Sequence, residues 1–307
     1  MHRNILIEQI KEKKSYLTVG LDTDIEKIPR HLQGKQNAVF EFNKQIIDAT
    51  KDLCVAYKIN TAFYEAMGIK GWKTMEETLN YIPSTHLKIA DAKRADIGNT
   101  SSYYAKAFFE NLNFDAITVA PYMGEDSIRP FLEYENKWTI VLGLTSNKGA
   151  ADFEMLRVVG ENTNHGSGVV GEDSNHGSGD TNHRDVLIGE DSNHGTKMLY
   201  EKVLQTVSSW GNKNNLMFVV GATKAEELIN IRKIIPEHFL LVPGVGFQGG
   251  SLADVSAHGM NEDCGLLVNA SRAIIYAGDK ENFAAEAREI ALQYQTEMEG
   301  LLKGKVL

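Results

Sequence analysis

The feature that most constrains the fold is a regular alternation of short apolar segments with longer segments of helical periodicity. Eight segments have the composition of β-strands, at 16–22, 54–60, 87–93, 116–121, 139–146, 216–223, 239–245 and 264–271. Helical periodicity is found at 5–14, 37–53, 71–81, 99–112, 125–135, 197–210, 224–235, 252–258 and 283–302. Strands that alternate with helices indicate a parallel sheet of the α/β class.

Eight such units predict a (β/α)8 TIM barrel that forms a single domain over 1–307. The 307 residues fit the ~250 of a typical barrel once a foreign insert at 158–196 is set aside. An open, doubly wound sheet is the alternative, but no G-x-G-x-x-G follows the first strand. Polar or charged residues end strands one, two, three, five and eight, and a barrel brings such ends to one mouth. The helix at 5–14 is expected to close the opposite end.

The third strand and the loop after it, LKIADAKRADIGNT, carry an unusual set of charges. Side chains alternate along a strand, so Leu87, Ile89, Asp91 and Lys93 are expected on one face, with Asp96 just beyond. A surface ion pair is the simpler interpretation of Asp91 and Lys93. It fits poorly here, because the same face carries apolar residues and burying charges without a purpose is costly.

Lys58 is a second unexpected charge, near the end of the apolar strand CVAYKIN. Alternation places it on the same face as Ala56 and Asn60. Farther along, the loop GVGFQGG at 244–250 follows strand seven, and NASRAI at 269–274 ends strand eight. Glycines let backbone N–H groups approach an anion, and strands seven and eight of such barrels often hold phosphate. Arg272 can bind phosphate with two hydrogen bonds.

These motifs in order resemble the orotidine 5′-phosphate decarboxylase family, most closely its longer bacterial-type branch. The resemblance rests on AYKIN, on D-x-K-x-x-D followed by I-G-N-T, on PGVGFQGG and on NASRAI. It implies the decarboxylation of orotidine 5′-phosphate to uridine 5′-phosphate in pyrimidine biosynthesis. Removing the carboxylate from C6 of the pyrimidine ring leaves a carbanion without an electron sink. A cofactor-free route therefore needs a fixed electrostatic field and an acid placed next to C6. No cofactor is expected.

The resemblance also implies roles for individual residues. Lys93 is the proton donor to C6, and Asp91 lies beside the substrate carboxylate. Lys58 orients Asp91 and reaches the ribose. The second aspartate, Asp96, is supplied across a dimer interface together with Thr100, so a homodimer with shared active sites is expected.

The substrate-binding residues follow from the same resemblance. Asp22 binds a ribose hydroxyl, and Asn60 lies on the face of Lys58. Ser146 reads the pyrimidine edge. Phosphate is bound by Gln248, by Arg272 and at Ser271, where the family has glycine and where only a backbone N–H is needed.

The insert at 158–196 differs in composition from the rest of the chain. It holds four of the nine histidines and seven acids against one base, which is −6 of the net charge of −9. Its Gly, Ser, Asn and Asp content favours turns and disorder, so we expect a flexible surface extension after strand five. A short hairpin formed by Val169, Val170 and 186–188 is one expectation, and metal binding by its histidines and acids is the alternative.

The composition excludes several classes of function. A net charge of −9 argues against a general nucleic-acid surface. No apolar run reaches the ~18 residues of a membrane span. Cys54 and Cys264 lie in apolar segments without C-x-x-C spacing, which favours buried free thiols in a cytoplasmic protein.

The sequence is also compatible with two other functions. One is a metal-dependent sugar-phosphate synthase or aldolase with a similar barrel. That class looks to need an acidic ligand where this chain has Lys58. The other is a non-catalytic metal-binding protein that uses the histidine-rich insert.

Overall fold

A closed barrel of parallel strands forms the centre of the molecule in the computed structural model, which describes residues 1–158, 196–246 and 249–307. Around the barrel the strand order is β1-β10-β9-β8-β5-β4-β3-β2. The strands are β1 (Leu17–Gly20), β2 (Ala56–Asn60), β3 (Leu87–Arg94), β4 (Ala116–Val119), β5 (Trp138–Leu144), β8 (Leu216–Val220), β9 (Phe239–Pro243) and β10 (Leu266–Ala270). The predicted (β/α)8 barrel is confirmed, and the open-sheet alternative is wrong because β1 pairs with both β2 and β10.

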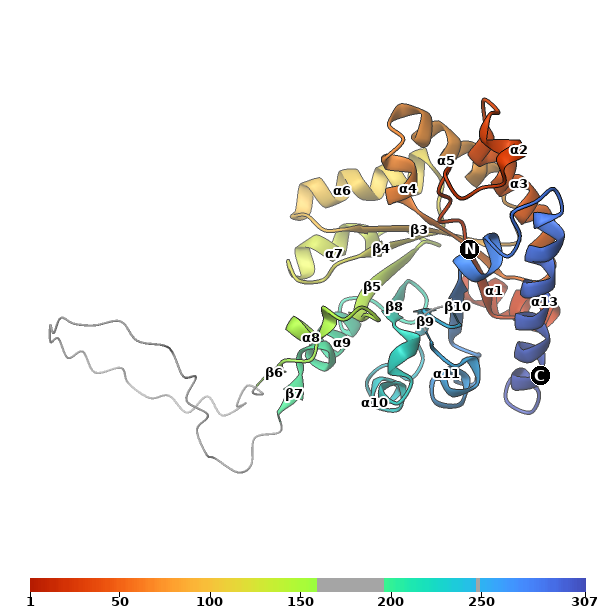
Figure 1. Cartoon of the computed structure of the whole chain (residues 1–307). Helices are drawn as coiled ribbons and strands as arrows, with labels where there is room; N and C mark the ends of the chain where they lie inside the picture. The colour runs from red at the N-terminus through yellow and green to blue at the C-terminus, as the bar shows by residue number, and fades with distance from the viewer. Residues whose placement is uncertain (159–195, 247–248) are drawn as a thin grey trace, which may run out of the picture.

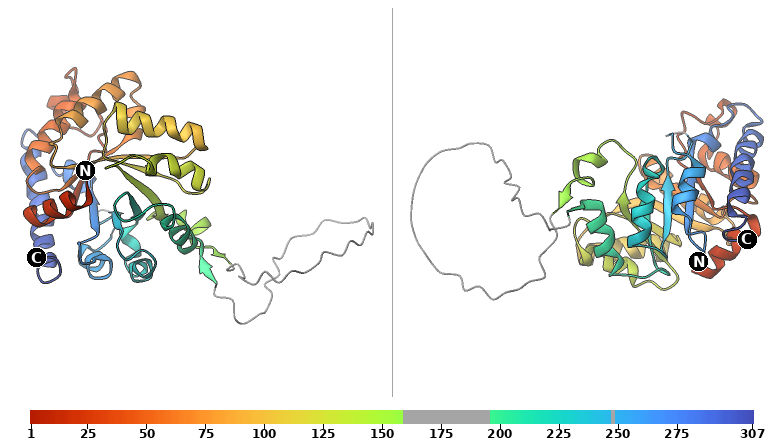
Figure 2. Two further views of the ribbon diagram at one scale, coloured as in Figure 1. Left: turned by 180° about the vertical axis from the view of Figure 1, so that it is seen from behind. Right: turned by 90° about the horizontal axis from the view of Figure 1, so that it is seen from below.

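Helices surround the barrel in a ring, as Figures 1 and 2 show. They are α1 (Arg3–Lys13), α2 (Arg30–Gln33), α3 (Ala38–Thr50), α4 (Thr61–Glu65), α5 (Ile69–Tyr81), α6 (Gly98–Lys106), α7 (Glu125–Leu132), α8 (Ala150–Phe153), α9 (Leu199–Ser208), α10 (Glu227–Ile234), α11 (Leu252–Gly259), α12 (Arg272–Ile275) and α13 (Phe283–Leu302). Within the described ranges, none of these helices is long and apolar enough to cross a bilayer.

The barrel strands are apolar on both faces because each one is covered by helices outside and by other strands' side chains inside. Every residue of β1, β4, β8 and β10 is buried. Two charged residues, Lys58 and Asp91, lie toward the carboxyl ends of β2 and β3. Burial therefore holds the strands in place, and the carboxyl ends carry the polar groups.

The N-terminal segment closes the end of the barrel opposite the mouth, as predicted. The Met1 carbonyl accepts a hydrogen bond from Trp138 Nε1 at 2.7 Å. Arg3 is buried and donates to the carbonyl oxygens of Lys213 and Glu237, at 2.8 Å each, just before β8 and β9. These contacts join the starts of several strands, so chemistry is left to the other end.

The structure differs from the sequence prediction mainly in short elements. The helices α2, α4, α8 and α12 were not predicted, because four or five residues give too little periodicity to detect. The predicted helix at 197–210 begins at Leu199, since Lys197 and Met198 form β7, which pairs with β6 (Arg157–Val158) in antiparallel fashion. Val158 therefore belongs to this small sheet rather than to the insert. The expected hairpin at Val169, Val170 and 186–188 lies outside the described residues.

Candidate active site

Four charged side chains meet at the mouth of the barrel in an unbroken chain of contacts. Lys58 Nζ lies 3.1 Å from Asp22 Oδ1 and 3.0 Å from Asp91 Oδ2. Asp91 Oδ1 in turn lies 2.6 Å from Lys93 Nζ. The Lys58 side chain is only 5% exposed, whereas that of Lys93 is 50% exposed. Lys93 is therefore the member of the chain that is open to an incoming molecule.

The strand register brings these groups together. Lys58 on β2 is paired with Gly20 at the end of β1, and Asp22 follows two residues later. Asp91 on β3 is paired with Asn60 on β2. Because parallel strands end at the same edge, residues far apart in the chain lie close together at the mouth.

Regular alternation along β3 ends near Asp91. The register with β4 shifts between Ala90 and Arg94, and Lys93 has a φ of 47° in the left-handed region. A residue with a side chain adopts this conformation only at some cost. The sequence predicted Lys93 on the face of Asp91 by simple alternation. The lysine does reach Asp91, but through this local irregularity of the strand.

The charges in the chain shift one another's ionisation. Burial raises the pKa of Asp91, but Lys58 and Lys93 outweigh it and hold that pKa below its usual range. Burial likewise lowers the pKa of Lys58, and the carboxylates of Asp22 and Asp91 more than offset it, so that the pKa is raised. Both groups therefore stay charged around neutral pH.

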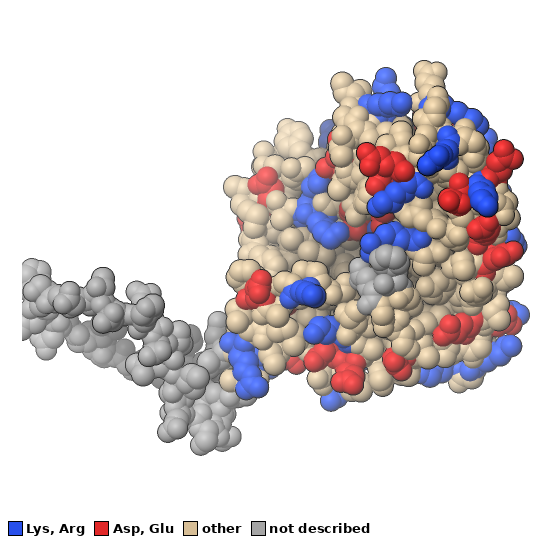
Figure 3. Space-filling model, in the orientation of Figure 1, with Lys and Arg blue, Asp and Glu red and all other residues tan. Residues whose placement is uncertain are grey.

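A cavity of about 140 Å³ connects this chain of charges with the predicted phosphate end. Asp22, Lys58 and Asp91 line it on one side, and Gly244, Ser271 and Arg272 are among the residues that line it on the other. On the face shown in Figure 3, basic side chains gather beside acidic ones near a central hollow. The structure thus brings both sets of motifs to one small polar site.

Close contacts with glycines surround two of the predicted substrate-binding serines, Ser271, which lines the cavity, and Ser146, which is not among its lining residues. Ser271 Oγ donates to the Gly20 carbonyl at 3.0 Å, and a Cβ on Gly20 would lie 2.7 Å from the Ser271 Cβ. A Cβ on Gly221 would lie 2.7 Å from the Cβ of Ser146. Glycine is required at both positions, because any other residue there would displace a predicted substrate-binding serine.

The chain matches the family model of the orotidine 5′-phosphate decarboxylase / HUMPS family over residues 15–287. It belongs to this family. A relative from Flavobacterium johnsoniae is 54% identical over 303 residues, which cover 98% of both chains. One from Phocaeicola vulgatus is 51% identical and covers 98% of this chain and 99% of its own. Both carry the name orotidine 5′-phosphate decarboxylase.

Solved structures agree with this assignment. A putative orotidine-monophosphate-decarboxylase from Toxoplasma gondii has a TM-score of 0.77 at 30% identity, covering 98% of this chain and 97% of its own. The OMP decarboxylase of Leishmania donovani has a TM-score of 0.72 at 33% identity, covering 96% and 99%. The predicted decarboxylase family is thereby confirmed.

Three predicted site residues, two from the aspartate motif and Asn60 from AYKIN, do not join the chain of charges. Asp96 is half-buried and its Oδ1 accepts from the N–H of Ile97 at 2.8 Å. Thr100 is exposed on the first turn of α6. Asn60 caps α4 by accepting from the N–H of Ala62 at 3.2 Å. Their roles stay predictions, and Gln248 lies outside the described residues.

Thr118 on β4 contacts the chain of charges and was not predicted from the sequence. Its hydroxyl bonds both Asp91 and the backbone of Lys93. The only sequence signal was a hydroxyl within the apolar segment AITV, and such threonines also occur in ordinary strands.

Acidic metal ligands are not clustered in the part of the chain that the structure describes, where no group of three His, Cys, Asp or Glu side chains is suited to a metal ion. The metal-dependent synthase or aldolase class looks to need an acidic ligand on strand two. This chain has Lys58 there, a buried cation that is ion-paired to two carboxylates. A metal bound there would face a positive charge. The metal-binding alternative for the insert falls on residues 159–195, outside the described ranges.

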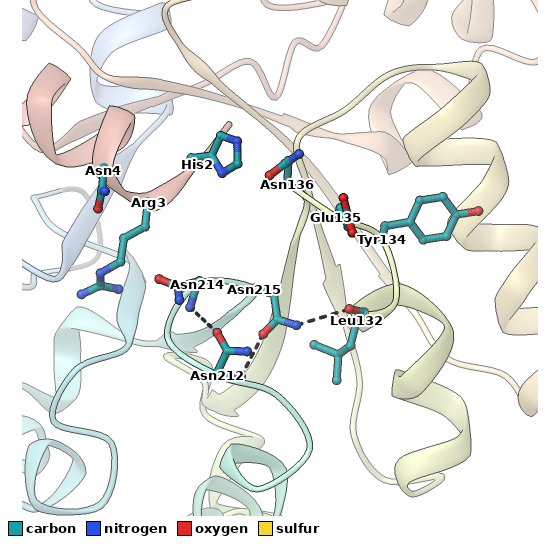
Figure 4. Close-up of a pocket in the computed structure, with 10 residues that line it drawn as sticks. All are labelled: His2, Arg3, Asn4, Leu132, Tyr134, Glu135, Asn136, Asn212, Asn214 and Asn215. Atoms are coloured by element: carbon teal, nitrogen blue, oxygen red, sulfur yellow. Dashed lines mark hydrogen bonds between the residues drawn. The ribbon is translucent and has the colours of Figure 1, made fainter.

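A second cavity, of about 490 Å³, lies at the closed end of the barrel, away from the decarboxylase motifs. Three of its asparagines, Asn212, Asn214 and Asn215, come from the loop before β8, and Figure 4 shows them bonded within that loop and to the Leu132 carbonyl. Arg3, also on its wall, is held by backbone carbonyls. Arg3 and the three loop asparagines already have partners, and the cavity lies far from the charged residues at the mouth, so we assign it no part in the chemistry.

Proposed function

We propose that the chain decarboxylates orotidine 5′-phosphate to uridine 5′-phosphate and carbon dioxide at the mouth of the barrel, with Lys93 as the acid. The activity itself follows from relatives more than 50% identical over nearly the whole chain, all named for this reaction. The metal-dependent synthase alternative has no support among them. The single structural observation that carries the proposal is the chain Asp22–Lys58–Asp91–Lys93, which joins the cavity of Arg272.

The chemistry assigns a task to each end of this chain. The bond from C6 to the carboxylate breaks, carbon dioxide leaves, and the electron pair remains on C6. A proton from the Lys93 ammonium then moves to C6, and the neutral amine regains a proton from solvent. A fixed cation next to a developing carbanion stabilises the transition state without reorganisation.

Asp91 and Lys58 supply the field around that step. Asp91 stays ionised because two lysines hold its pKa low, so it presents a negative charge to the substrate carboxylate. That repulsion is relieved when carbon dioxide leaves. Lys58, buried between Asp22 and Asp91, keeps Asp91 in place and is proposed to reach the ribose.

At the other end of the cavity, Arg272 and Ser271 are proposed to bind the phosphate, with Gln248 from the neighbouring loop. Arg272 begins the short helix α12 directly after β10, and it lines the same cavity as Lys58. Phosphate bound there fixes the distance from the phosphate to C6, and remote binding energy of this kind is used to orient the reacting atoms.

A direct assay tests this function. Loss of orotidine 5′-phosphate is followed by ultraviolet absorbance in the presence of EDTA, with carbon dioxide and uridine 5′-phosphate measured as products. Equal amounts of both products and no effect of EDTA are expected. Activity that disappears with EDTA and returns with a divalent metal would instead point to the metal-dependent alternative.

A homodimer with shared active sites is the second part of the proposal. It is supported by apolar side chains exposed next to Asp96 and Thr100, notably Ile97 at 60% and Tyr103 at 68%. Exposed groups of this kind mark interaction surfaces. A second copy is the proposed partner, because a two-fold interface would carry Asp96 and Thr100 of each copy toward the other copy's Lys93.

Mixing two inactive variants tests the sharing of sites. Asp96→Ala and Lys93→Ala homodimers are both expected to be inactive. In a mixed dimer one site receives both changes and the other receives neither. Random exchange makes half of the dimers mixed, so about a quarter of wild-type activity returns. No recovery after verified subunit exchange would place Asp96 in the site of its own chain.

A cytoplasmic location is also proposed. Cys54 and Cys264 are buried and unpaired. Free thiols persist in reducing compartments, which supports this location.

A further inference from the structure

Thr118 stands between the two catalytic residues of β3. Its side chain is almost fully buried on β4, the strand next to β3. The Thr118 hydroxyl donates to Asp91 Oδ1 at 3.0 Å, and its oxygen accepts from the Lys93 N–H at 3.0 Å. One hydroxyl therefore contacts the carboxylate and the backbone of the proposed acid at once.

We propose that Thr118 is a positioning residue for the decarboxylation, which holds Asp91 and Lys93 in a fixed mutual arrangement. This inference rests on the proposed function of Lys93 and Asp91. Thr118 itself is not proposed to touch the substrate, since it acts through these two residues.

The direction of both hydrogen bonds is determined by their partners. An ionised carboxylate only accepts hydrogen bonds, and a backbone N–H only donates. Asp91 is kept ionised by the neighbouring lysines, so the Thr118 proton must point at Asp91 Oδ1. The hydroxyl has no second orientation that satisfies both neighbours, and this makes it a rigid link.

The backbone of β3 needs this link at the place where Thr118 lies. The β3–β4 register shifts between Ala90 and Arg94, and Lys93 takes the left-handed conformation. At this point the Lys93 N–H bonds a side chain, Thr118 Oγ1, instead of a strand carbonyl. Backbone pairing resumes where the Ala120 N–H donates to the Arg94 carbonyl at 3.0 Å. The Thr118 hydroxyl thus replaces the missing partner of the strand.

Loss of the hydroxyl would affect the site in two ways. Among the described residues, Asp91 Oδ1 would keep only Lys93 Nζ as a donor, and the Lys93 N–H would lose the Thr118 oxygen as its acceptor. Both changes favour a rotation of the carboxylate or a relaxation of the Lys93 backbone. Small displacements of reacting groups are expensive, with about 100-fold in rate for a misplacement of about 1 Å.

Three substitutions separate positioning from packing. Thr118→Val keeps the shape and removes the hydroxyl, whereas Thr118→Ser keeps the hydroxyl. Thr139→Val is the matched control, because Thr139 on β5 is equally buried and its Oγ1 has no hydrogen-bond partner among the described residues. kcat and KM for orotidine 5′-phosphate, the dissociation constant of uridine 5′-phosphate and the melting temperature are measured for each.

We expect Thr118→Val to lower kcat by about 10- to 100-fold, the effect of losing a hydrogen bond to a charged group. KM should change little, because Thr118 is not proposed to touch the substrate. The dissociation constant of uridine 5′-phosphate should also change little, because this product lacks the carboxylate beside which Asp91 lies. Thr118→Ser should restore most of kcat, and Thr139→Val should behave as wild type.

A wild-type kcat in Thr118→Val, or no recovery in Thr118→Ser, overturns the positioning role while leaving the proposed function in place. A wild type without decarboxylase activity overturns the proposed function instead. If Thr118→Val does not fold, the comparison of Thr118→Ala with Thr118→Ser decides, since both leave similar space and only one keeps the hydroxyl.

Discussion

Replacing Lys58 by methionine removes one buried charge while keeping most of the length of the side chain. Lys58 Nζ lies 3.1 Å from Asp22 Oδ1 and 3.0 Å from Asp91 Oδ2. At an effective dielectric of about 20, each contact represents about 5 kcal/mol of attraction before the cost of burying the charges. Removing one partner of a buried ion pair costs about 3–5 kcal/mol in the free energy of unfolding. We expect Lys58→Met to lose about this much stability at pH 7.

The stability lost in Lys58→Met should become smaller as the pH falls. In the wild type the folded pKa of Asp91 is lowered, so Asp91 contributes stability above its unfolded pKa, and this is lost as the pH falls through the folded value. Without Lys58 that folded pKa rises, and acid destabilises the variant less. The difference in the free energy of unfolding between wild type and variant should therefore shrink below about pH 4.

Urea titrations from pH 3 to pH 7 measure this difference. Lys88→Met is the matched control, because Lys88 is a half-buried lysine on β3 with no ion pair among the described residues. Its effect should be small, with only the weak pH dependence that the nearby carboxylate of Asp115 gives. A Lys58→Met difference that stays constant from pH 7 to pH 3 would refute the coupling of Lys58 to Asp91. We also expect the turnover of Lys58→Met to fall by at least about 100-fold, as when a preorganised electrostatic group is removed.

Three further predictions concern the phosphate end, the insert and acid stability. Arg272→Ala should weaken binding of uridine 5′-phosphate by about 10- to 100-fold and leave uridine binding unchanged; equal losses for both ligands would contradict a phosphate role. Replacing residues 159–196 by a short turn between Val158 and Lys197, which are already paired, should keep most activity, since loop length costs little; failure to fold would show that the insert packs on the barrel. Burial and Lys13 lower the pKa of His86 from 6.5 to about 4, so the unfolded state binds more protons between these values. The free energy of unfolding should then fall by up to about 3 kcal/mol from pH 6.5 to 4. If the free energy of unfolding of His86→Gln falls with pH as steeply as that of wild type, this prediction is contradicted.

Much of the fold and part of the site were predictable from the sequence, for a simple reason. Strands buried on both faces give long apolar segments, and barrel closure then brings their polar ends together. Lys58 and Asp91 were detectable because charges are rare in such segments. Arg272 and Asp22 follow strands that become neighbours only when the barrel closes, and the strand count implied that closure.

The rest depended on geometry that local patterns do not encode. The shift of register after Ala90 and the left-handed backbone at Lys93 arise from the packing of β3 on β4. Thr118 lies in an ordinary apolar segment, and its importance appears only when Asp91 and Lys93 are placed beside it. The short helix α4, capped by Asn60, has too few residues for periodicity to show.

The most direct test of the account is the turnover of Lys93→Ala. Because the Lys93 side chain is half exposed, its removal should leave the melting temperature and the circular dichroism spectrum close to those of wild type. Decarboxylation of orotidine 5′-phosphate, followed by ultraviolet absorbance, should be abolished, since Lys93 is the acid proposed to reach C6. A folded Lys93→Ala protein that retains most of the wild-type turnover would contradict the proposed mechanism.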